Sequence, residues 1–371
     1  MANVTDITAA FSGTITDTLA NLADSGSITT NFSRARGDDG DVNVVVSDGT
    51  GTLSAADLGA VTAKTTGTVT LDNAQTISGT GAEVTAALIT NAATLSAASN
   101  ATVTGNVTAE VAGNIANVTD ITAAFSGTIT DTLANLAASG SITTNFSRAR
   151  GDDGDVNVVV SDGTGTLSAA DLGAVTAKTT GTVTLDNAQT ISGTGAEVTA
   201  ALITNAATLS AASNATVTGN VTAEVAGNIA NVTDITAAFS GTITDTLANL
   251  AASGSITTNF SRARGDDGDV NVVVSDGTGT LSAADLGAVT AKTTGTVTLD
   301  NAQTISGSGA ELIAALKTNA ATLSAASTAT VTSAVTAAVA AEIAAIASIT
   351  LDSSGSGTIT DTLANLLNGG Q

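Results

Sequence analysis

The 371-residue sequence contains no Cys, His, Pro, Trp or Tyr. Without Cys there is no disulfide framework, thiolate nucleophile or zinc-finger ligand set. Without His the commonest general base is missing, and a Ser nucleophile would have no imidazole partner. The sequence therefore predicts a protein that is not an enzyme and that uses no cofactor, with calcium left open as a ligand.

Basic residues are scarce, and long apolar runs are absent. Ten Lys and Arg stand against 33 Asp and Glu, which gives a net charge of −23. This balance argues against nucleic acid and anionic lipid as partners, because both are bound through cations. Thr, Gly, Asn or Asp interrupts every apolar stretch before it reaches about 18 residues, so membrane insertion is not expected.

What the chain does contain is a long repeat. The pentapeptide Val-Thr-Asp-Ile-Thr begins at Val4, Val118 and Val232, so the period is 114 residues. Asp24 becomes Ala138 between the first two copies, and the third copy follows the second as far as Gly307. We expect one continuous solenoid over residues 1–371, with units 4–117, 118–231 and 232–345 and a closing coil at 346–371.

A weaker repeat divides each unit into four. Gly13, Gly51, Gly79 and Gly105 precede similar segments, and their spacings of 38, 28, 26 and 22 residues reach Gly127 of the next copy. Four coils per copy and a closing coil predict about thirteen coils in the chain.

Each segment that follows one of these glycines has features of a short helix. Thr14 with Asp17, Ser54 with Asp57, and Thr80 with Glu83 have the spacing of a capping box, in which a hydroxyl and a carboxylate bind the first free amides of a helix. The fourth segment, around Glu110, has no hydroxyl at this offset.

Short segments rich in β-branched residues lie between the expected helices. Residues 42–46, 68–71, 75–78 and 102–104 alternate apolar and polar side chains, which predicts strands with Val and Ile inward and Thr outward. The absence of Pro leaves every amide free to join a ladder between coils. The predicted fold class is a right-handed β-solenoid with short strands and one short helix per coil.

The third copy changes near its end. Gly105, Asn106, Glu110 and Gly113 correspond to Ser333, Ala334, Ala338 and Ala341. The loss of two glycines favours a helix, and we expect residues 333–371 to cap the solenoid and protect its last strand edge.

The segment Arg34-Ala35-Arg36-Gly37-Asp38-Asp39-Gly40-Asp41 most resembles a site, and we expect it to project as a turn or hairpin. Its carboxylates are hard ligands suited to Ca²⁺. The alternative is a solvated turn in which Arg34 and Arg36 partly neutralise the acids. The candidate metal ligands in the three copies are Asp38, Asp39, Asp41, Asp152, Asp153, Asp155, Asp266, Asp267 and Asp269.

Two further binding hypotheses come from short motifs. Arg36-Gly37-Asp38 is an integrin-type tripeptide, although three letters often occur by chance. The pairs Thr14/Thr16, Thr68/Thr70 and Thr102/Thr104 raise ice binding, in which ranked hydroxyls and methyls on a flat face order water. That function requires the pairs to stack on one face in successive coils.

The segments Gly-Thr-Ile-Thr-Asp-Thr-Leu-Ala-Asn-Leu and Gly-Thr-Gly-Ala-Glu-Val-Thr-Ala-Ala-Leu, at Gly13 and Gly79, resemble the Thr/Ala/Gly-rich repeats of very large bacterial surface proteins, especially cyanobacterial ones. The resemblance implies an extracellular or cell-surface role as a stalk, filament or adhesin spacer. Neighbouring repeats or copies of the chain itself are the expected partners. A Ca²⁺-binding or ice-binding module is the alternative.

Overall fold

The computed structural model describes residues 8–352 and 356–368. The chain divides into two compact units. The first comprises Met1–Gly163, Ala170–Asn187 and Asn205–Ser210, and the second comprises Thr164–Ala169, Ala188–Thr204 and Ala211–Gln371. The division passes through the second copy of the repeat, and both units contain the same kinds of coil.

Short strands and helices alternate through the first copy. Its elements are β1 (Thr14–Asp17), α1 (Leu19–Leu22), β2 (Ala23–Asp24), β3 (Ser27–Ile28), α2 (Thr30–Asp38), β4 (Asn43–Val46), β5 (Gly51–Ser54), α3 (Ala55–Thr62), β6 (Val69–Leu71), β7 (Gln75–Thr80), α4 (Gly81–Thr85), the π-helix η1 (Ala86–Thr90), β8 (Thr94–Leu95), β9 (Ser99–Thr104) and α5 (Ala109–Ile115).

The second copy repeats this order and adds a strand at its start. Its elements are β10 (Ile121–Phe125), β11 (Thr128–Asp131), α6 (Leu133–Leu136), β12 (Ala137–Ala138), β13 (Ser141–Ile142), α7 (Thr144–Asp152), β14 (Asn157–Val160), β15 (Gly165–Ser168), α8 (Ala169–Thr176), β16 (Val183–Leu185), β17 (Gln189–Thr194), α9 (Gly195–Thr199), η2 (Ala200–Thr204), β18 (Thr208–Leu209), β19 (Ser213–Thr218) and α10 (Ala223–Ile229).

The third copy and the closing coil complete the chain. They contain β20 (Ile235–Phe239), β21 (Thr242–Asp245), α11 (Leu247–Leu250), β22 (Ala251–Ala252), β23 (Ser255–Ile256), α12 (Thr258–Asp266), β24 (Asn271–Val274), β25 (Gly279–Ser282), α13 (Ala283–Thr290), β26 (Val297–Leu299), β27 (Gln303–Gly307), α14 (Gly309–Ile313), η3 (Ala314–Thr318), β28 (Thr322–Leu323), β29 (Ser327–Val331), α15 (Ala337–Ala344), β30 (Ile349–Leu351) and α16 (Leu363–Asn368).

Parallel sheets join each coil to the next. In the first unit the sheet orders are β1-β4-β6-β8, β10-β9-β7-β5 and β11-β14-β16-β18, and in the second they are β15-β17-β19-β20, β21-β24-β26-β28 and β25-β27-β29-β30. Equivalent strands keep the same register, as in Thr14↔Asn43, Thr128↔Asn157 and Thr242↔Asn271. Strand and helix units in tandem, paired in parallel, make the fold a repeat solenoid of about thirteen coils, as predicted. The hand of the coil stays a prediction.

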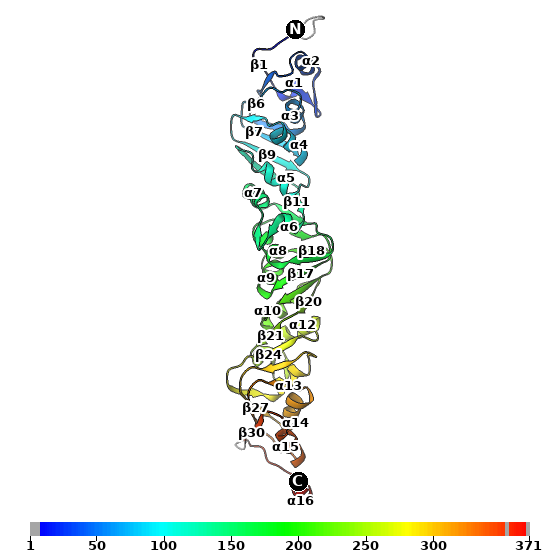
Figure 1. Ribbon diagram of the computed structural model, residues 1–371, viewed down its shortest axis with the longest axis vertical. Helices are drawn as coiled ribbons and strands as arrows, with labels where there is room; N and C mark the ends of the chain where they lie inside the picture. Colours follow the sequence, from blue (N-terminus) through cyan, green and yellow to red (C-terminus); the bar gives the residue numbers. More distant parts are fainter. Residues whose placement is uncertain (1–7, 353–355, 369–371) are drawn as a thin grey trace. The chain divides into compact units, whose positions relative to one another are not determined.

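The alternation in the sequence sets which side chains form the core. Along β9, Ser99, Ala101 and Val103 are buried while the residues between them face outward. The predicted strand segments are confirmed, with Val and Ile inward except for Val45, which lies on the outward side of β4. Figure 1 shows α3, α4 and α5 following one another along one side of β7 and β9. These helices close the core with aliphatic residues, among them the fully buried Leu58, Val84 and Ala112.

Hydroxyl caps begin most of the helices. The capping box of Thr80 and Glu83 is present in both directions. Ser54 caps α3, but the Asp57 carboxylate binds the Gly26 amide at 2.6 Å instead of the Ser54 amide. Thr108 caps α5 through the Val111 amide, a cap that the capping-box spacing does not detect.

The interpretation of Thr14 and Asp17 as a capping box is wrong. Residues 14–17 form strand β1, and the helix begins later, at Leu19. Asp17 instead accepts from the Thr18 amide at 2.8 Å and from the Asn21 side chain at 2.7 Å. A hydroxyl and an acid three residues apart can thus also lie in a strand, where the acid accepts a hydrogen bond from the amide of the next residue.

The expected projecting loop is also wrong, because most of it is helical. Helix α2 covers Thr30–Asp38, is capped by Thr29 and buries Phe32. Its equivalents α7 and α12 bury Phe146 and Phe260 completely. A small antiparallel hairpin, β2 with β3, precedes the helix. The long first coil of each copy therefore carries an additional packed helix where a loop was predicted.

At the boundary between copies, one sheet ends and another begins at different points along the chain. Strand β10 pairs with β9 and is the last strand of its sheet, whereas β11, three residues further on, begins a new sheet with β14. An isolated bridge between Val107 and Ile129 connects the two copies at this point. The start of one copy is consequently interleaved with the end of the one before it.

The closing coil extends the third copy by a further layer. Strand β30 pairs with β29, and Val335 bridges Ile359. As predicted, α15 is longer than α5, with eight residues against seven. The closing coil does not bury its own apolar side chains: Ile359, Leu363 and Leu366 are 56%, 73% and 45% exposed, whereas the equivalent Ile129, Leu133 and Leu136 are buried. Residues 353–355 and 369–371 of the expected cap lie outside the described residues.

Candidate functional site

The candidate metal ligands lie at the end of a helix, where two of them bind backbone amides of a strand. In the second copy Asp152 Oδ2 accepts from the Ala123 amide at 2.8 Å, and Asp153 Oδ2 accepts from the Phe125 amide at 2.7 Å. The same bonds recur with Asp38, Asp39, Asp266 and Asp267. Ala123 and Phe125 belong to β10, the outermost strand of its sheet. The acid pair thus satisfies the outward amides of an exposed strand edge, a feature that proteins must protect.

The third candidate in each copy lies beside the second. Asp155 is exposed, and its carboxyl is close enough to Asp153 to affect that residue's ionisation. Burial is the largest cause that raises the pKa of Asp153, and the Asp155 carboxylate raises it further. Asp267 responds to burial and Asp269 in the same way. In the first copy the raised pKa belongs to Asp41, next to Asp39.

These acids do not form a cation site by geometry. Among residues 8–352 and 356–368, no group of three or more Asp or Glu side chains is arranged to hold a metal ion. Two of the three acids in each copy are already bonded to backbone amides. The calcium hypothesis therefore has no supporting arrangement in the described part of the chain.

Arg36, one of the two arginines expected to neutralise the acids in part, binds a backbone carbonyl of the next coil. Arg36 donates from Nε to the Lys64 carbonyl at 2.5 Å, and Arg150 and Arg264 do the same with Lys178 and Lys292. They therefore connect the helix to the next coil. In the Arg36-Gly37-Asp38 tripeptide both charged side chains make contacts within the fold, since Asp38 binds the Ala9 amide.

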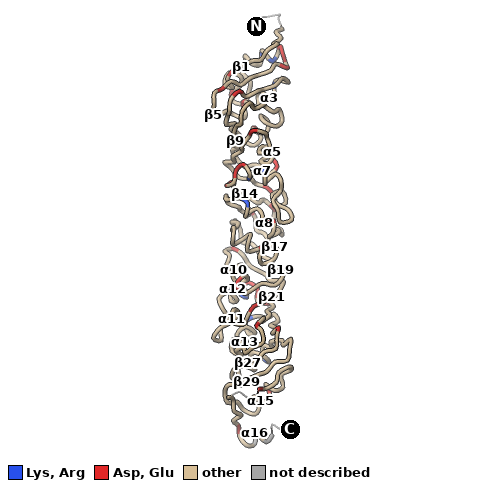
Figure 2. Tube along the Cα trace, turned by 90° about the vertical axis from the view of Figure 1, so that its left-hand side faces the viewer, with Lys and Arg blue, Asp and Glu red and all other residues tan. Residues whose placement is uncertain are grey.

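Other aspartates also reach backbone amides far away in sequence. Asp48 accepts from Leu19 at 2.6 Å, Asp57 from Gly26 at 2.6 Å, and Asp131 from Ala109 at 3.0 Å. Leu19 and Ala109 are the first residues of helices, where amides have no partner within the helix. Figure 2 shows acidic residues distributed along the trace of each unit. The acidic composition thus reflects a repeated structural role.

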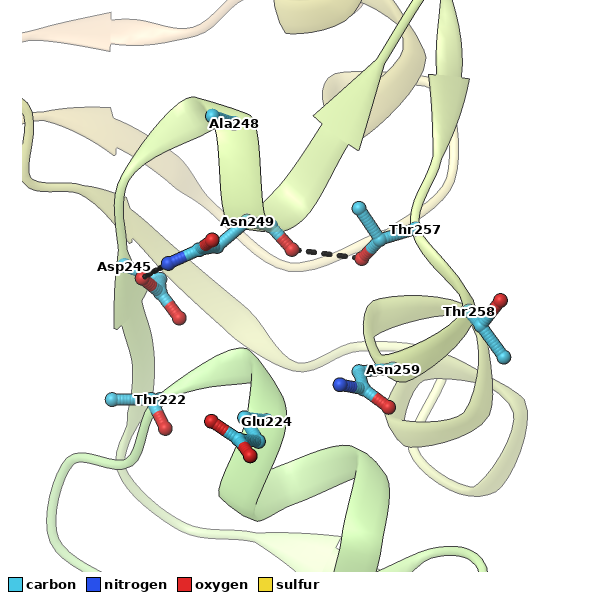
Figure 3. A pocket seen from close by; sticks show the side chains of 8 residues that line it. All are labelled: Thr222, Glu224, Asp245, Ala248, Asn249, Thr257, Thr258 and Asn259. Carbon is cyan, nitrogen blue, oxygen red and sulfur yellow. Dashed lines mark hydrogen bonds between the residues drawn. The ribbon is translucent and has the colours of Figure 1, made fainter.

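A polar groove forms where one copy meets the next. In the second unit it has a volume of about 340 Å³ and lies between the starts of α10, α11 and α12 (Figure 3). Its lining residues are Thr222, Glu224, Asp245, Ala248, Asn249, Thr257, Thr258 and Asn259. An equivalent groove of about 340 Å³ in the first unit is lined by Thr108, Glu110, Asp131, Ala134, Asn135, Thr143, Thr144 and Asn145.

Several polar groups that line the groove are already hydrogen-bonded within the protein. Asp245 accepts from the Asn249 side chain at 2.7 Å and from the Ala223 amide at 3.0 Å. The Thr257 hydroxyl donates to the Asn249 backbone carbonyl at 2.8 Å. Figure 3 shows this bond and the one between Asn249 and Asp245. The lining residues include no His, Cys, Lys or Arg.

Outward hydroxyls form rows on one sheet of each copy. In the third copy Thr280, Thr304, Thr328 and Thr350 occupy consecutive strands in register. The predicted Thr-x-Thr pairs do not stack in this way. Thr14 and Thr16 are separated from Thr70 by β4, which places Asn43 and Val45 in those positions, and Thr102 and Thr104 lie in a different sheet. The sequence pairs therefore misidentify which hydroxyls align.

The sequence predicts no membrane insertion, and the helices bear on this prediction. None of those in the described ranges combines the length and the apolar character that crossing a bilayer requires.

Comparison with known proteins identifies no family. No family model and no curated protein matches the chain. Among solved structures, the plant peptide hormone receptor RGFR1 in complex with RGF2 aligns at 12% identity and a TM-score of 0.21, covering 88% of this chain and 57% of the receptor chain. PEPR1-AtPEP1 aligns at 11% and 0.18, covering 86% and 52%.

The LRR ectodomain of the Arabidopsis receptor kinase HAESA, in complex with an IDA peptide hormone, aligns at 14% identity and a TM-score of 0.20, covering 86% of this chain and 66% of that one. The chain thus spans about half to two thirds of the length of these receptor chains. Likenesses this distant give no information about a ligand.

Proposed function

We propose that the protein is a non-enzymatic structural rod, serving as an extracellular stalk, filament or adhesin spacer. The observation that carries the proposal is the identical register of equivalent strands in the three copies. Modules that pair in the same way can be added or removed without a change in what each coil contacts. A spacer requires that property, and an active site does not.

The use of the polar residues supports the same role. The aspartates that recur in each copy bind amides of neighbouring segments, and the arginines bind carbonyls of the next coil. These bonds hold one layer to another. The compositional resemblance to bacterial surface repeats supports a location outside the cell, and the net charge of −23 favours solubility there.

The rod is tested with chains of two, three and four 114-residue units. If the coils stack at about 4.8 Å each, every added unit should lengthen the particle by about 19 Å at constant cross-section. Small-angle scattering measures both quantities. A compact particle whose radius grows with the cube root of mass would refute the rod.

The spacer role needs a second measurement, on cells. The same series is displayed on a cell surface with an epitope at the outer end, and antibody access is measured beneath a polymer brush of fixed height. Access should increase with the number of units. Access that is independent of that number would reject the spacer role while leaving the rod intact.

Ice binding is the second candidate, favoured by the aligned hydroxyls of the third copy. Thr304 and Thr328 lie 2.9 Å apart between their hydroxyls, within the row that runs from Thr280 to Thr350. Adjacent strands repeat at about 4.8 Å, so the row presents regularly spaced hydroxyls and methyls. Such a surface can order water into a lattice.

Thermal hysteresis of freezing is the test of this second candidate. Thr304→Lys with Thr328→Lys should abolish it, because two charged chains interrupt the row. Thr298→Lys, on strand β26 of the other sheet, is the matched control and should keep it. Absence of hysteresis in the unchanged protein would reject the hypothesis.

A further inference from the structure

The acceptor tripeptide for N-linked sugars, Asn-x-Ser or Asn-x-Thr, recurs through the chain. One period holds four of them: Asn100-Ala101-Thr102, Asn106-Val107-Thr108, Asn117-Val118-Thr119 and Asn145-Phe146-Ser147. The same four return 114 residues later, at Asn214, Asn220, Asn231 and Asn259, and two more begin at Asn3 and Asn31. A chain rich in Asn and Thr contains this tripeptide from composition alone, so the fold has to show which ones are open.

Access to the tripeptide depends on its middle residue as well as on its Asn. A transferring enzyme must bring the Asn amide nitrogen to the sugar donor and contact the hydroxyl two residues later, which requires an exposed loop. A middle side chain that lies in the core holds the tripeptide against the protein, because removing it would forfeit the free energy of burial. An acceptor in the folded chain therefore needs all three residues at least partly exposed.

Two of the four tripeptides are closed by strand pairing. Ala101 is fully buried in β9, which pairs with β7 on one side and with β10 on the other. Val107 is buried and bridges Ile129 of the next copy, and the Asn106 side chain accepts from the Thr128 amide at 3.2 Å. Neither tripeptide can leave the surface without breaking the connection between coils.

A third tripeptide is closed by helix packing. It lies at the start of α2, α7 and α12, and its middle residue is buried in every copy, as Phe32, Phe146 and Phe260. In the second copy the Asn itself also lies against another helix. A Cβ added to Gly113 of α5 would be only 2.5 Å from the Asn145 Cα, so the two backbones are in close contact there.

The fourth tripeptide is open. Asn117 and Thr119 are exposed, and Val118 is only half-buried. The three residues form the turn between α5 and β10, which ends at Asp120 with a φ of 64°. Within the described ranges, the side chains of Asn117 and Thr119 make no hydrogen bond. The next occurrence, which begins at Asn231, has the same exposure at each of its three positions.

We propose that Asn117 and Asn231 are acceptor sites for an N-linked sugar, supplied by a donor that carries a phosphate ester at the sugar's C1. In the transfer the bond from C1 to the phosphate oxygen breaks, and the phosphate leaves with the electron pair. C1 forms a bond to the Asn Nδ2, which gives up one proton to a base of the transferring enzyme. The proposal goes beyond the structural role, because it assigns a covalent modification to one turn of the repeat.

The test uses the folded full chain with Asn3→Gln, since residue 3 lies outside the described residues. One sample receives nucleotide-linked glucose and a soluble N-glycosyltransferase, and another receives a lipid-linked oligosaccharide and a purified oligosaccharyltransferase. Intact-mass spectrometry should show two sugars per chain, because the third copy has Ala345-Ile346-Ala347 in place of the tripeptide. The sample that gains them identifies the donor. No sugar in either sample would overturn the proposal.

Substitutions in the turn show which residues are used. Asn117→Gln should leave one sugar per chain, and Asn117→Gln with Asn231→Gln should leave none. Thr119→Ala with Thr233→Ala should also abolish the transfer, whereas the matched Thr119→Ser with Thr233→Ser should keep it. All four positions are exposed, so the variants should fold as the unchanged chain does. Two sugars on the double Gln variant would show that other tripeptides are used and would overturn the proposal.

Unfolded peptides separate the effect of the fold from that of the sequence. Four short peptides, centred on Asn100, Asn106, Asn117 and Asn145, are offered to the same two enzymes. All four should accept the sugar, because none of them has a buried middle residue. Refusal of the Asn117 peptide by both enzymes would overturn the proposal, since the tripeptide would then lack what the transfer requires.

Discussion

Single aspartates explain much of the acidic composition without a ligand. Asp48, Asp131 and Asp152 each accept an amide from a residue more than twenty positions away. A carboxylate can accept several such bonds, and bonds to an ionised acceptor are stronger than neutral ones. The sequence shows the acids and their spacing, but the distant amides become visible only when the coils are stacked.

Calcium should have no effect on stability. The two amide-bonded aspartates of each copy would have to give up these bonds to bind an ion. We expect the melting temperature to be the same in calcium and in chelator, measured by calorimetry, since an ion that does not bind the folded state cannot stabilise it. A rise of several degrees that is lost in Asp152→Asn with Asp153→Asn would contradict this.

Removal of the repulsion between Asp153 and Asp155, and between Asp267 and Asp269, should raise stability at neutral pH. The raised pKa of Asp153 and Asp267 means that the folded state holds these protons more tightly than the unfolded chain. Stability therefore falls as the pH rises from the ordinary Asp pKa through the raised one. Asp155→Asn with Asp269→Asn should raise the free energy of unfolding at pH 7 by less than about 1 kcal/mol.

The pH dependence distinguishes this effect from a general change in charge. Urea unfolding at about pH 2 should show no gain in the double variant, because Asp153 and Asp267 are then protonated in the folded and the unfolded state. Asp24→Asn removes an exposed charge with no acid partner of this kind and is the control. An equal gain at both pH values would contradict the repulsion between Asp153 and Asp155.

At the scale of elements, strands are easier to predict than helices in this chain. The alternation in residues 68–71 and 75–78 is a property of the strand itself, so the prediction is confirmed. Helix α2 contains Gly37 and a single buried residue, Phe32, so its own pattern is weak. Contacts from elsewhere hold it: Asp38 and Asp39 bind residues 9 and 11, and Arg36 binds Lys64. Such a helix is specified by its neighbours.

The acid pair should protect the sheet edge at β10. Asp152→Ala with Asp153→Ala leaves the outward amides of Ala123 and Phe125 without these acceptors, and we expect concentration-dependent association measured by light scattering. Asp152→Asn with Asp153→Asn keeps an oxygen acceptor and should remain dispersed at the same concentration. Association of both variants would point to lost charge as the cause.

At the scale of the whole molecule, the identical registers predict that one copy can be removed. Deletion of residues 118–231 joins Asn117 to Val232, and Ile243 then takes the bridge to Val107 that Ile129 makes. Because each remaining interior coil keeps two neighbours of the same sequence, the chain should fold with a similar melting temperature.

An out-of-phase deletion is the control for this prediction. Removal of residues 118–186 joins α5 directly to the segment before β17, so that β9 keeps its pairing with β7 but loses β10, its partner on the other side. Far-UV circular dichroism should show loss of structure in this variant only. If both deletions unfold the chain, the solenoid is one cooperative body and its coils are not separable.

The interleaved boundary, with β10 in one sheet and β11 in the next, has a consequence for how such a gene changes. Unequal crossing-over between two copies exchanges DNA at any matching position, inside a strand or between strands. Since all three copies share one register, every such product encodes a chain whose layers still match. Copy number can therefore vary between generations in whole units of 114 residues, and the strands at each new junction still pair in the same register.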